Sequence, residues 1–170
     1  MTATAATYDH LPARSRLVAE ALAAAGATGT VRELDVPART AAEAAAALGC
    51  AVGAIANSLV FIGEDGQGHG EPVLVLTSGS HWVDTEALAR RMGLAALARA
   101  TADQVRAATG QAIGGVAPVG HPAPLRTVVD LALAAHPRVW AAGGTPHTIF
   151  PTTHAELLVL TGGAALAVTP

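Results

Sequence analysis

The sequence contains no lysine, and all ten of its basic residues are arginines. Any mechanism that needs a lysine amine is therefore excluded. Thirteen acidic residues outweigh the arginines and give a net charge of −3 at pH 7. Proteins that coat a nucleic-acid backbone depend on clustered Lys and Arg, so an extensive basic face is not expected. The charge is still compatible with a partner that is held at one end only.

Cysteine and long apolar runs are also scarce. Cys50 is the only cysteine, so no internal disulfide can form, which is consistent with a reducing cytoplasm. We expect Cys50 to be a small buried side chain rather than a nucleophile. The first ten residues show no basic segment followed by an apolar one. Apolar runs end well short of the roughly 18 residues that cross a membrane. The sequence thus predicts a cytoplasmic protein with no signal peptide and no membrane partner.

Aromatic residues make up only 3% of the chain. The core must therefore consist mainly of Val, Leu, Ile and Ala, with four large side chains among them: Trp82, Trp140, Phe61 and Phe150. We expect both tryptophans to be core residues rather than platforms on which nucleic-acid bases stack.

The sequence shows no pattern typical of a metal or cofactor site. Its seven histidines lack the HExxH spacing, and a single cysteine cannot complete a Cys/His ligand set. No P-loop or GxGxxG fingerprint occurs either. The segment from Ser78 to His81 has the residue types of a serine nucleophile. Adjacent residues of an extended chain point to opposite faces, however, so Ser80 and His81 are poorly placed as a pair. We expect neither a metal nor a cofactor.

Helix and strand patterns alternate in an order that favours an α+β fold. Thr40 and Thr153 each open a capping box with a Glu three residues later, and Asp84 and Thr101 stand at further N-cap positions. The expected helices span 11–25, 40–49, 84–92, 101–110 and 153–162. The expected strands span 30–36, 57–63, 72–79, 94–100, 125–133, 138–144, 147–151 and 164–168. Residues 94–100 could also form a helix, but a strand there leaves Thr101 free to cap the next helix. We predict one domain over residues 1–170, with a helical segment over 1–29 and a mixed or antiparallel sheet that is partly closed.

The stretch from Thr109 to Pro118, TGQAIGGVAP, has the composition of a loop that binds a ligand with its backbone. Gly110, Gly114 and Gly115 can adopt positive φ and let a ligand approach the main chain closely. The prolines from Pro118 onward make the end of the segment rigid. If successive N–H groups point inward, they form a cradle for an anion or an oxyanion without a charged side chain. The alternative is an ordinary crossover loop, and local composition does not decide between the two.

Several segments together resemble the YbaK/EbsC family, also called the ProX-type or prolyl-tRNA-synthetase-associated editing domain. The Gly-x-x-x-Pro loop, from Gly114 to Pro118, is the most specific mark of that family. The matching segments are AAEAAAALGCAVGAIANSLVF (41–61), VLVLTSGSHWVD (73–84), ATADQVRAATGQAIGGVAPVG (100–120), VVD (128–130), VWAAGG (139–144) and TTHAELLVLTGG (152–163). The resemblance implies a strongly bent mixed sheet, a partly closed barrel surrounded by helices, with a pocket roofed by this loop.

Members of that family are trans-editing hydrolases that cleave a small, wrong amino acid from the 3′-terminal adenosine of a tRNA. The resemblance implies the same activity here, without a cofactor, with the aminoacyl-tRNA 3′ end as partner and an aminoacyl-tRNA synthetase as a further candidate partner. Catalysis would fall to Asn57 and to the N–H groups of Gly114 and Gly115, which would bind the oxyanion. A pocket behind a glycine-rich loop would select by size, and water would be the nucleophile.

The resemblance also implies a set of substrate-binding residues. Asp130 has an alternative reading as a polar residue that hydrogen-bonds main chain at the sheet edge. The Gly143–Gly144 pair fits either a plain turn or a border of the pocket. The full set is Ser58, Ser78, Gly79, Ser80, Thr109, Gly110, Val116, Pro118, Asp130, Gly143, Gly144 and His147.

The sequence departs from the family at Asn57. Many active relatives carry a lysine there, thought to hold the terminal phosphate or adenosine, whereas Asn57 offers hydrogen bonds but no charge. An arginine elsewhere could restore that charge in three dimensions. The sequence is compatible with three hypotheses: an active deacylase with altered specificity, a binding module that has kept the pocket but lost turnover, and a hydrolase of another small ester or amide.

Overall fold

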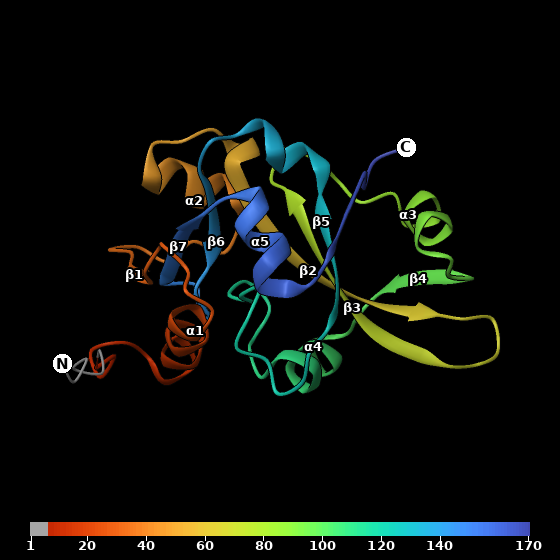
Figure 1. Cartoon of the computed structure of the whole chain (residues 1–170), viewed down its shortest axis with the longest axis horizontal. Coiled ribbons are helices and arrows are strands. Elements are labelled where there is room, and N and C mark those ends of the chain that lie inside the picture. Colours follow the sequence, from red (N-terminus) through yellow and green to blue (C-terminus); the bar gives the residue numbers. More distant parts are fainter. Residues whose placement is uncertain (1–6) are drawn as a thin grey trace.

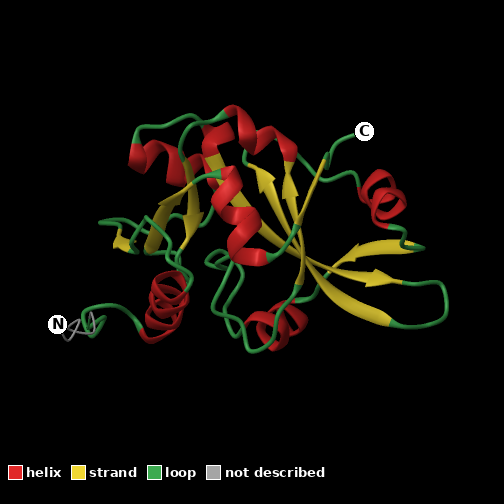
Figure 2. Ribbon diagram, viewed as in Figure 1, coloured by secondary structure: helices red, strands yellow, loops and turns green. Residues whose placement is uncertain are grey.

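The computed structural model describes residues 7–170, in which helices pack on both faces of one eight-stranded sheet (Figures 1 and 2). The helices are α1 (Ala13–Ala24), α2 (Ala41–Leu48), α3 (Thr85–Met92), α4 (Ala102–Thr109) and α5 (His154–Thr161), with 3₁₀ helices η1 (Val52–Ala54) and η2 (Leu131–Ala135). The strands are β1 (Arg32–Glu33), β2 (Ile55–Glu64), β3 (Gly70–Ser78), β4 (Ala96–Arg99), β5 (Arg126–Asp130), β6 (Val139–Ala142), β7 (Thr148–Thr152) and β8 (Ala164–Leu166).

The sheet is mixed and strongly bent, as predicted (Figure 2). Its order is β1-β7-β6-β2-β3-β5-β8, and β4 pairs with β2 outside this path. The hairpin of β2 and β3 is antiparallel, whereas β2 with β6, β3 with β5, and β5 with β8 are parallel. The sheet bends strongly but does not close into a barrel. A barrel closes only when its end strands pair, and here β1 and β8 are two and three residues long and lie at opposite ends of the order.

The pleat of the strands divides the core between the two faces of the sheet. On β3, Leu74 and Leu76 belong to a large cluster with residues of α1, α4 and α5. Val73 and Val75 point the other way and pack with residues of α3. On that second face a separate, smaller cluster joins α2 to Trp140. The second face is thus covered by α3 at one place and by α2 at another, and the central strand β2 runs from one to the other.

Two expectations about individual residues need correction. Trp82 is 63% exposed rather than part of the core, because β3 ends at Ser78 and Trp82 lies in the irregular segment that leads to α3. Phe61, Phe150 and Trp140 are buried as expected. At α2 the Thr40 hydroxyl accepts the N–H of Glu43, but the Glu43 carboxylate accepts the N–H of Arg39 and not that of Thr40.

Candidate functional site

The central strand β2 changes its partner on one side halfway along its length. Its first two residues pair with β6, and residues 61–64 pair with β4. Residues 57–59 lie between these two stretches. They pair with β3 along one edge of β2, but along the edge that β6 and β4 share, no strand of the described chain lies beside them. The sheet therefore has an opening beside Asn57, Ser58 and Leu59.

A cavity of about 340 Å³ lies at this opening. That volume is within the range of small-molecule sites, roughly 300–1,000 Å³. Its walls come from the segment before α2, from α2 itself, from β6 and β7, and from the loop between α4 and β5. The lining residues are Leu34, Ala38, Arg39, Thr40, Ala41, Ala44, Ile55, Ala56, Asn57, Ser58, Leu59, Arg99, Ile113, Gly114, Val116, Trp140, Ala142, Pro146, Thr148 and Ile149.

One polar atom in this lining is buried without a partner. The Ser58 hydroxyl is inaccessible and forms no hydrogen bond with any described residue. A buried hydroxyl without a hydrogen bond costs free energy, and such a group calls for a physical explanation, such as a contact that forms with a ligand. Ser58 lines the cavity, so a rotation of its side chain toward a bound ligand would provide the missing hydrogen bond.

The loop between α4 and β5 packs closely on the rest of the site through two glycines. Gly114 has a φ of +92°, a conformation that favours glycine, and a Cβ there would lie 3.6 Å from Cγ of Arg39. A Cβ at Gly115 would lie 2.6 Å from main-chain atoms of Thr145. Glycine at position 115 is thus needed for the contact between this loop and the turn that joins β6 to β7.

The N–H groups of the loop are not equally available to a ligand. That of Gly115 donates to the carbonyl of Ala112 at 3.2 Å. Those of Gly114 and Val116, both in the lining, meet no protein acceptor within residues 7–170. The N–H of Ile113, which also lines the cavity, meets no protein acceptor there either, so Ile113, Gly114 and Val116 are the loop residues in the lining whose N–H groups can bind an oxyanion without breaking a turn.

Two side chains fix the main chain at the end of this loop. The Gln111 Oε1 accepts the N–H of Ala117 at 2.6 Å, and His121 Nε2 lies 2.7 Å from the Ala117 carbonyl, to which it donates. Gln111 and Ala117 are both buried. Burial lowers the pKa of His121, although its bond to Ala117 acts in the opposite direction. The neutral imidazole with a proton on Nε2 is thus the form that the structure favours.

The charged groups in the lining are all cationic. Arg39 and Arg99 line the cavity, whereas no carboxylate of the described residues does. Neither arginine forms an ion pair within residues 7–170. Two further guanidinium groups, those of Arg32 and Arg138, lie 5.2 and 5.9 Å from the ring centre of Trp140, which is itself a lining residue. The cavity is a locally positive site on an acidic protein.

The family model of the aminoacyl-tRNA editing domain matches residues 35–160. This range includes the opening beside β2 and every lining residue except Leu34. The chain belongs to the aminoacyl-tRNA editing domain family. The resemblance noted in the sequence is thereby confirmed.

Solved structures show that the fold of this editing domain is shared. A protein described as a candidate trans-editing enzyme for prolyl tRNA synthetase is 43% identical, with a TM-score of 0.85 over 94% of this chain and 99% of that one. The hypothetical protein APE2540 is 29% identical, with a TM-score of 0.81 over 91% of this chain and 99% of the other. The comparison with curated proteins gave no significant match.

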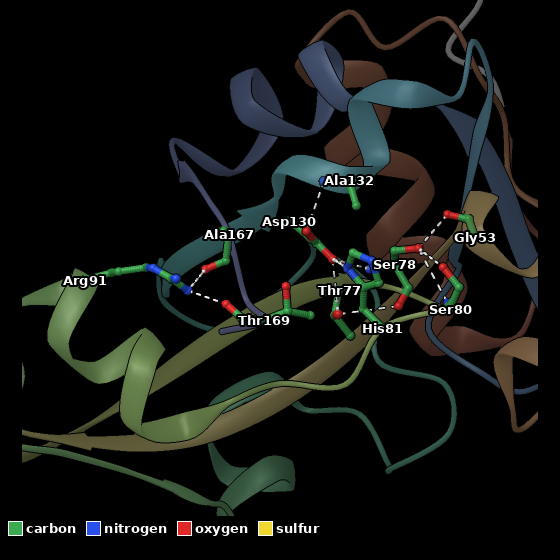
Figure 3. A network of polar contacts seen from close by, with 10 residues as sticks. All are labelled: Gly53, Thr77, Ser78, Ser80, His81, Arg91, Asp130, Ala132, Ala167 and Thr169. Atoms are coloured by element: carbon green, nitrogen blue, oxygen red, sulfur yellow. Dashed lines mark hydrogen bonds and ion pairs between the residues drawn. The ribbon is translucent and has the colours of Figure 1, made fainter.

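The editing domain has a second polar cluster, around Asp130 (Figure 3). The buried Asp130 carboxylate accepts the N–H groups of Ser78 and Ala132 and lies 3.0 Å from His81 Nδ1. The Ser78 hydroxyl donates to the Gly53 carbonyl and lies 3.1 Å from that of Ser80. No residue of this cluster lines the cavity. Its contacts join the end of β3 to β5, η1 and η2.

The expected site residues divide into two groups. Asn57, Ser58, Gly114 and Val116 line the cavity, and Gly115, in the same loop, packs against the main chain of Thr145. The remainder lie elsewhere. The second cluster contains or adjoins Ser78, Gly79, Ser80 and Asp130. A separate hollow is lined by Thr109, Gly110 and His121, and a further one by Pro118. Gly143 packs against Thr148, Gly144 packs against Arg14, and the His147 carbonyl accepts the N–H of Leu34.

Sequence reasoning missed the segment before α2 and the end of β4 as parts of the site. Arg39 and Arg99 lie in these places, and Trp140, expected only as a core residue, lines the cavity as well. The available signal was the absence of lysine, which required any cation at the site to be an arginine. Within the described residues, no group of three or more His, Cys, Asp or Glu side chains is arranged to bind a metal ion. No helix in this part of the chain is long and apolar enough to span a membrane.

Proposed function

We propose that this editing domain is a trans-acting deacylase that hydrolyses the ester between a small, wrongly attached amino acid and the 3′-terminal adenosine of a tRNA. The observation that carries the proposal is the cavity at the opening beside β2. It combines a buried Ser58 hydroxyl without a partner and two N–H groups of the Gly-x-x-x-Pro loop that are free to donate.

Ester hydrolysis at this site would depend on the loop backbone. Water attacks the carbonyl carbon, and the N–H groups of Gly114 and Val116 stabilise the negative oxygen that forms. The ester C–O bond then breaks, the ribose oxygen takes up a proton, and the free amino acid leaves. No Asp, Glu or His side chain of the described residues lines the cavity, so the substrate's own ribose hydroxyl is the group that assists the water. Asn57 contributes hydrogen bonds to the substrate.

The available space supports a preference for a small amino acid. A cavity of about 340 Å³ must hold the amino acid together with part of the adenosine, which leaves little room for a long side chain. Exclusion by size is how a second, hydrolytic sieve selects its substrates. The 43% identical structure described as a candidate trans-editing enzyme for prolyl tRNA synthetase supports a role beside a synthetase. We propose cytoplasmic action by a single domain, as the sequence predicts.

The decisive measurement is the rate of amino-acid release from a panel of aminoacyl-tRNAs. We expect rapid hydrolysis of one or a few tRNAs that carry a small amino acid. In the same assay Asn57→Lys should hydrolyse those tRNAs faster, because the lysine adds a charge that the neutral Asn57 lacks. If neither protein released any amino acid while both still bound tRNA, the deacylase would be refuted and the binding module would take its place. Selective cleavage of a small ester that is not attached to tRNA would identify the third hypothesis.

A further inference from the structure

Cationic side chains reach the cavity from both ends of the opening beside β2. Arg39 precedes α2, and Arg99 is the last residue of β4. In Figure 1, α2 and β4 lie toward opposite ends of β2. Arg39 packs against Gly114, and the Arg99 guanidinium lies 5.7 Å from the ring centre of Phe61. Both side chains are exposed at the mouth of the cavity rather than enclosed in it.

These two charges have no protein counterion. Neither arginine forms an ion pair within the described residues. The acidic residues nearest to them in the chain are Asp35 and Glu43 for Arg39 and Asp103 for Arg99, and none of these lines the cavity. Glu43 accepts the main-chain N–H of Arg39, and Asp103 pairs with Arg106. A guanidinium presents its N–H groups in a planar fork that fits a phosphate, and such charge-assisted bonds are stronger than neutral ones. An amino acid carries both signs of charge when free and is cationic when esterified. The unpaired cations therefore fit an anionic group of the ligand.

We infer that Arg39 and Arg99 bind the phosphates next to the terminal adenosine. The inference rests on the proposed function, because it assumes that the ligand is the 3′ end of an RNA. Asn57 lies in the opening between the two arginines and contacts the uncharged part of the ligand. Affinity for the RNA end then depends on two exposed guanidinium groups, and it must weaken as salt rises.

Binding of a short RNA that ends in adenosine tests the inference without any need for turnover. Arg39→Gln and Arg99→Gln should each weaken binding by about threefold to tenfold, as expected for the loss of one charge-assisted contact at an exposed site. Each should also reduce the slope of log affinity against log salt by about 0.7, the value for one phosphate contact in a single strand. Arg90→Gln is the matched control, because Arg90 is an exposed arginine on α3 that does not line the cavity.

Two further probes separate phosphate binding from loss of structure. Arg39→Lys and Arg99→Lys keep the charge and should retain most of the salt dependence. Adenosine without phosphate should bind the wild type and both glutamine variants equally. The inference is overturned if Arg39→Gln and Arg99→Gln bind the RNA with the same affinity and salt slope as Arg90→Gln. If they weaken binding as expected but no aminoacyl-tRNA is ever hydrolysed, the deacylase fails while the phosphate contact stands.

Discussion

Ser58 shows how a residue can be poorly satisfied in the free protein and still suit its site. Its hydroxyl is buried and lacks a hydrogen-bond partner in the described chain, and Ala56 and Val60, two residues away along β2, are buried on either side of it. Burying such a group opposes folding. We expect the Ser58 side chain to turn toward the cavity and form this hydrogen bond when a ligand is bound.

Replacing Ser58 should therefore separate stability from activity. Ser58→Ala removes an unsatisfied polar group, so its free energy of unfolding should equal or exceed that of the wild type by up to about 1 kcal/mol. Its deacylation rate should fall by about tenfold or more, as expected for the loss of one ligand hydrogen bond. Urea unfolding and single-turnover deacylation measure the two quantities.

Ser78→Ala is the matched control. The Ser78 hydroxyl donates to the Gly53 carbonyl at 2.8 Å and does not line the cavity, so this variant should lose about 1 kcal/mol of stability and keep its activity. A Ser58→Ala protein that is less stable than the wild type but fully active would contradict the role assigned to Ser58.

Side chains near the two ends of the loop between α4 and β5 fix the conformation of its main chain. Gln111 and His121 bond the N–H and the carbonyl of the same residue, Ala117. This fixes residues 112–116 against the cavity even though the loop contains no regular structure. His121 can donate to Ala117 while uncharged, and burial lowers its pKa below the usual value of 6.5.

The loop should accordingly weaken the protein in acid. The unfolded chain takes up a proton at His121 near pH 6.5, whereas the folded chain resists it until a lower pH. Unfolding therefore binds a proton in this window, and stability falls as the pH drops from about 6.5 toward the folded pKa. His121→Gln keeps a donor for Ala117 but cannot titrate. Urea unfolding at pH 7.5 and 5.5 should show a larger loss for the wild type than for His121→Gln.

His69→Gln controls for the removal of a histidine as such, since His69 is exposed at the tip of the β2–β3 hairpin and its ion pair with Asp65 is exposed too, where such pairs contribute little to stability. It should retain the pH dependence of the wild type. Equal pH dependence in the wild type and His121→Gln would show that His121 is not held in its neutral form.

At the scale of the whole molecule, the cluster around Asp130 joins parts of the fold that are distant in sequence. Its carboxylate bonds the end of β3 and the start of η2, and it lies at the end of β5 (Figure 3). Because the cluster lies outside the cavity, we expect it to support the fold and not the chemistry.

Asp130→Asn should then destabilise the protein without changing its catalysis. The side-chain N–H₂ of the asparagine would face one of the main-chain N–H groups that donate to the carboxylate in the wild type. The loss of that hydrogen bond should lower the free energy of unfolding by about 2–4 kcal/mol. Deacylation at low temperature, where the variant is still folded, should match the wild type. Asp103→Asn, which alters an exposed ion pair with Arg106, should change stability by less than about 1 kcal/mol. A stable but inactive Asp130→Asn protein would point to a catalytic role instead.

Most of the elements could be predicted from the sequence because their signals are local. The hydroxyl caps of Thr40, Thr101 and Thr153 act over three residues, and the β2–β3 hairpin needs only two strand patterns and a glycine-rich connection. The Gly-x-x-x-Pro loop is recognisable for the same reason, since its glycines mark a special backbone wherever they occur. Asn57 and Ser58 are assigned to the site through the family resemblance, and both line the cavity.

The sequence by itself determined the fold class, the loop and the absence of lysine at the site. Only the tertiary structure decided where the sheet is open and that its end strands, β1 and β8, do not pair to close it. It also decided that Trp82 is exposed and which arginines reach the cavity. Arg39 and Arg99 belong to separate elements, and no local pattern relates them. Their convergence depends on β2 exchanging β6 for β4 along one edge, and strand pairing of this kind joins residues far apart in the chain.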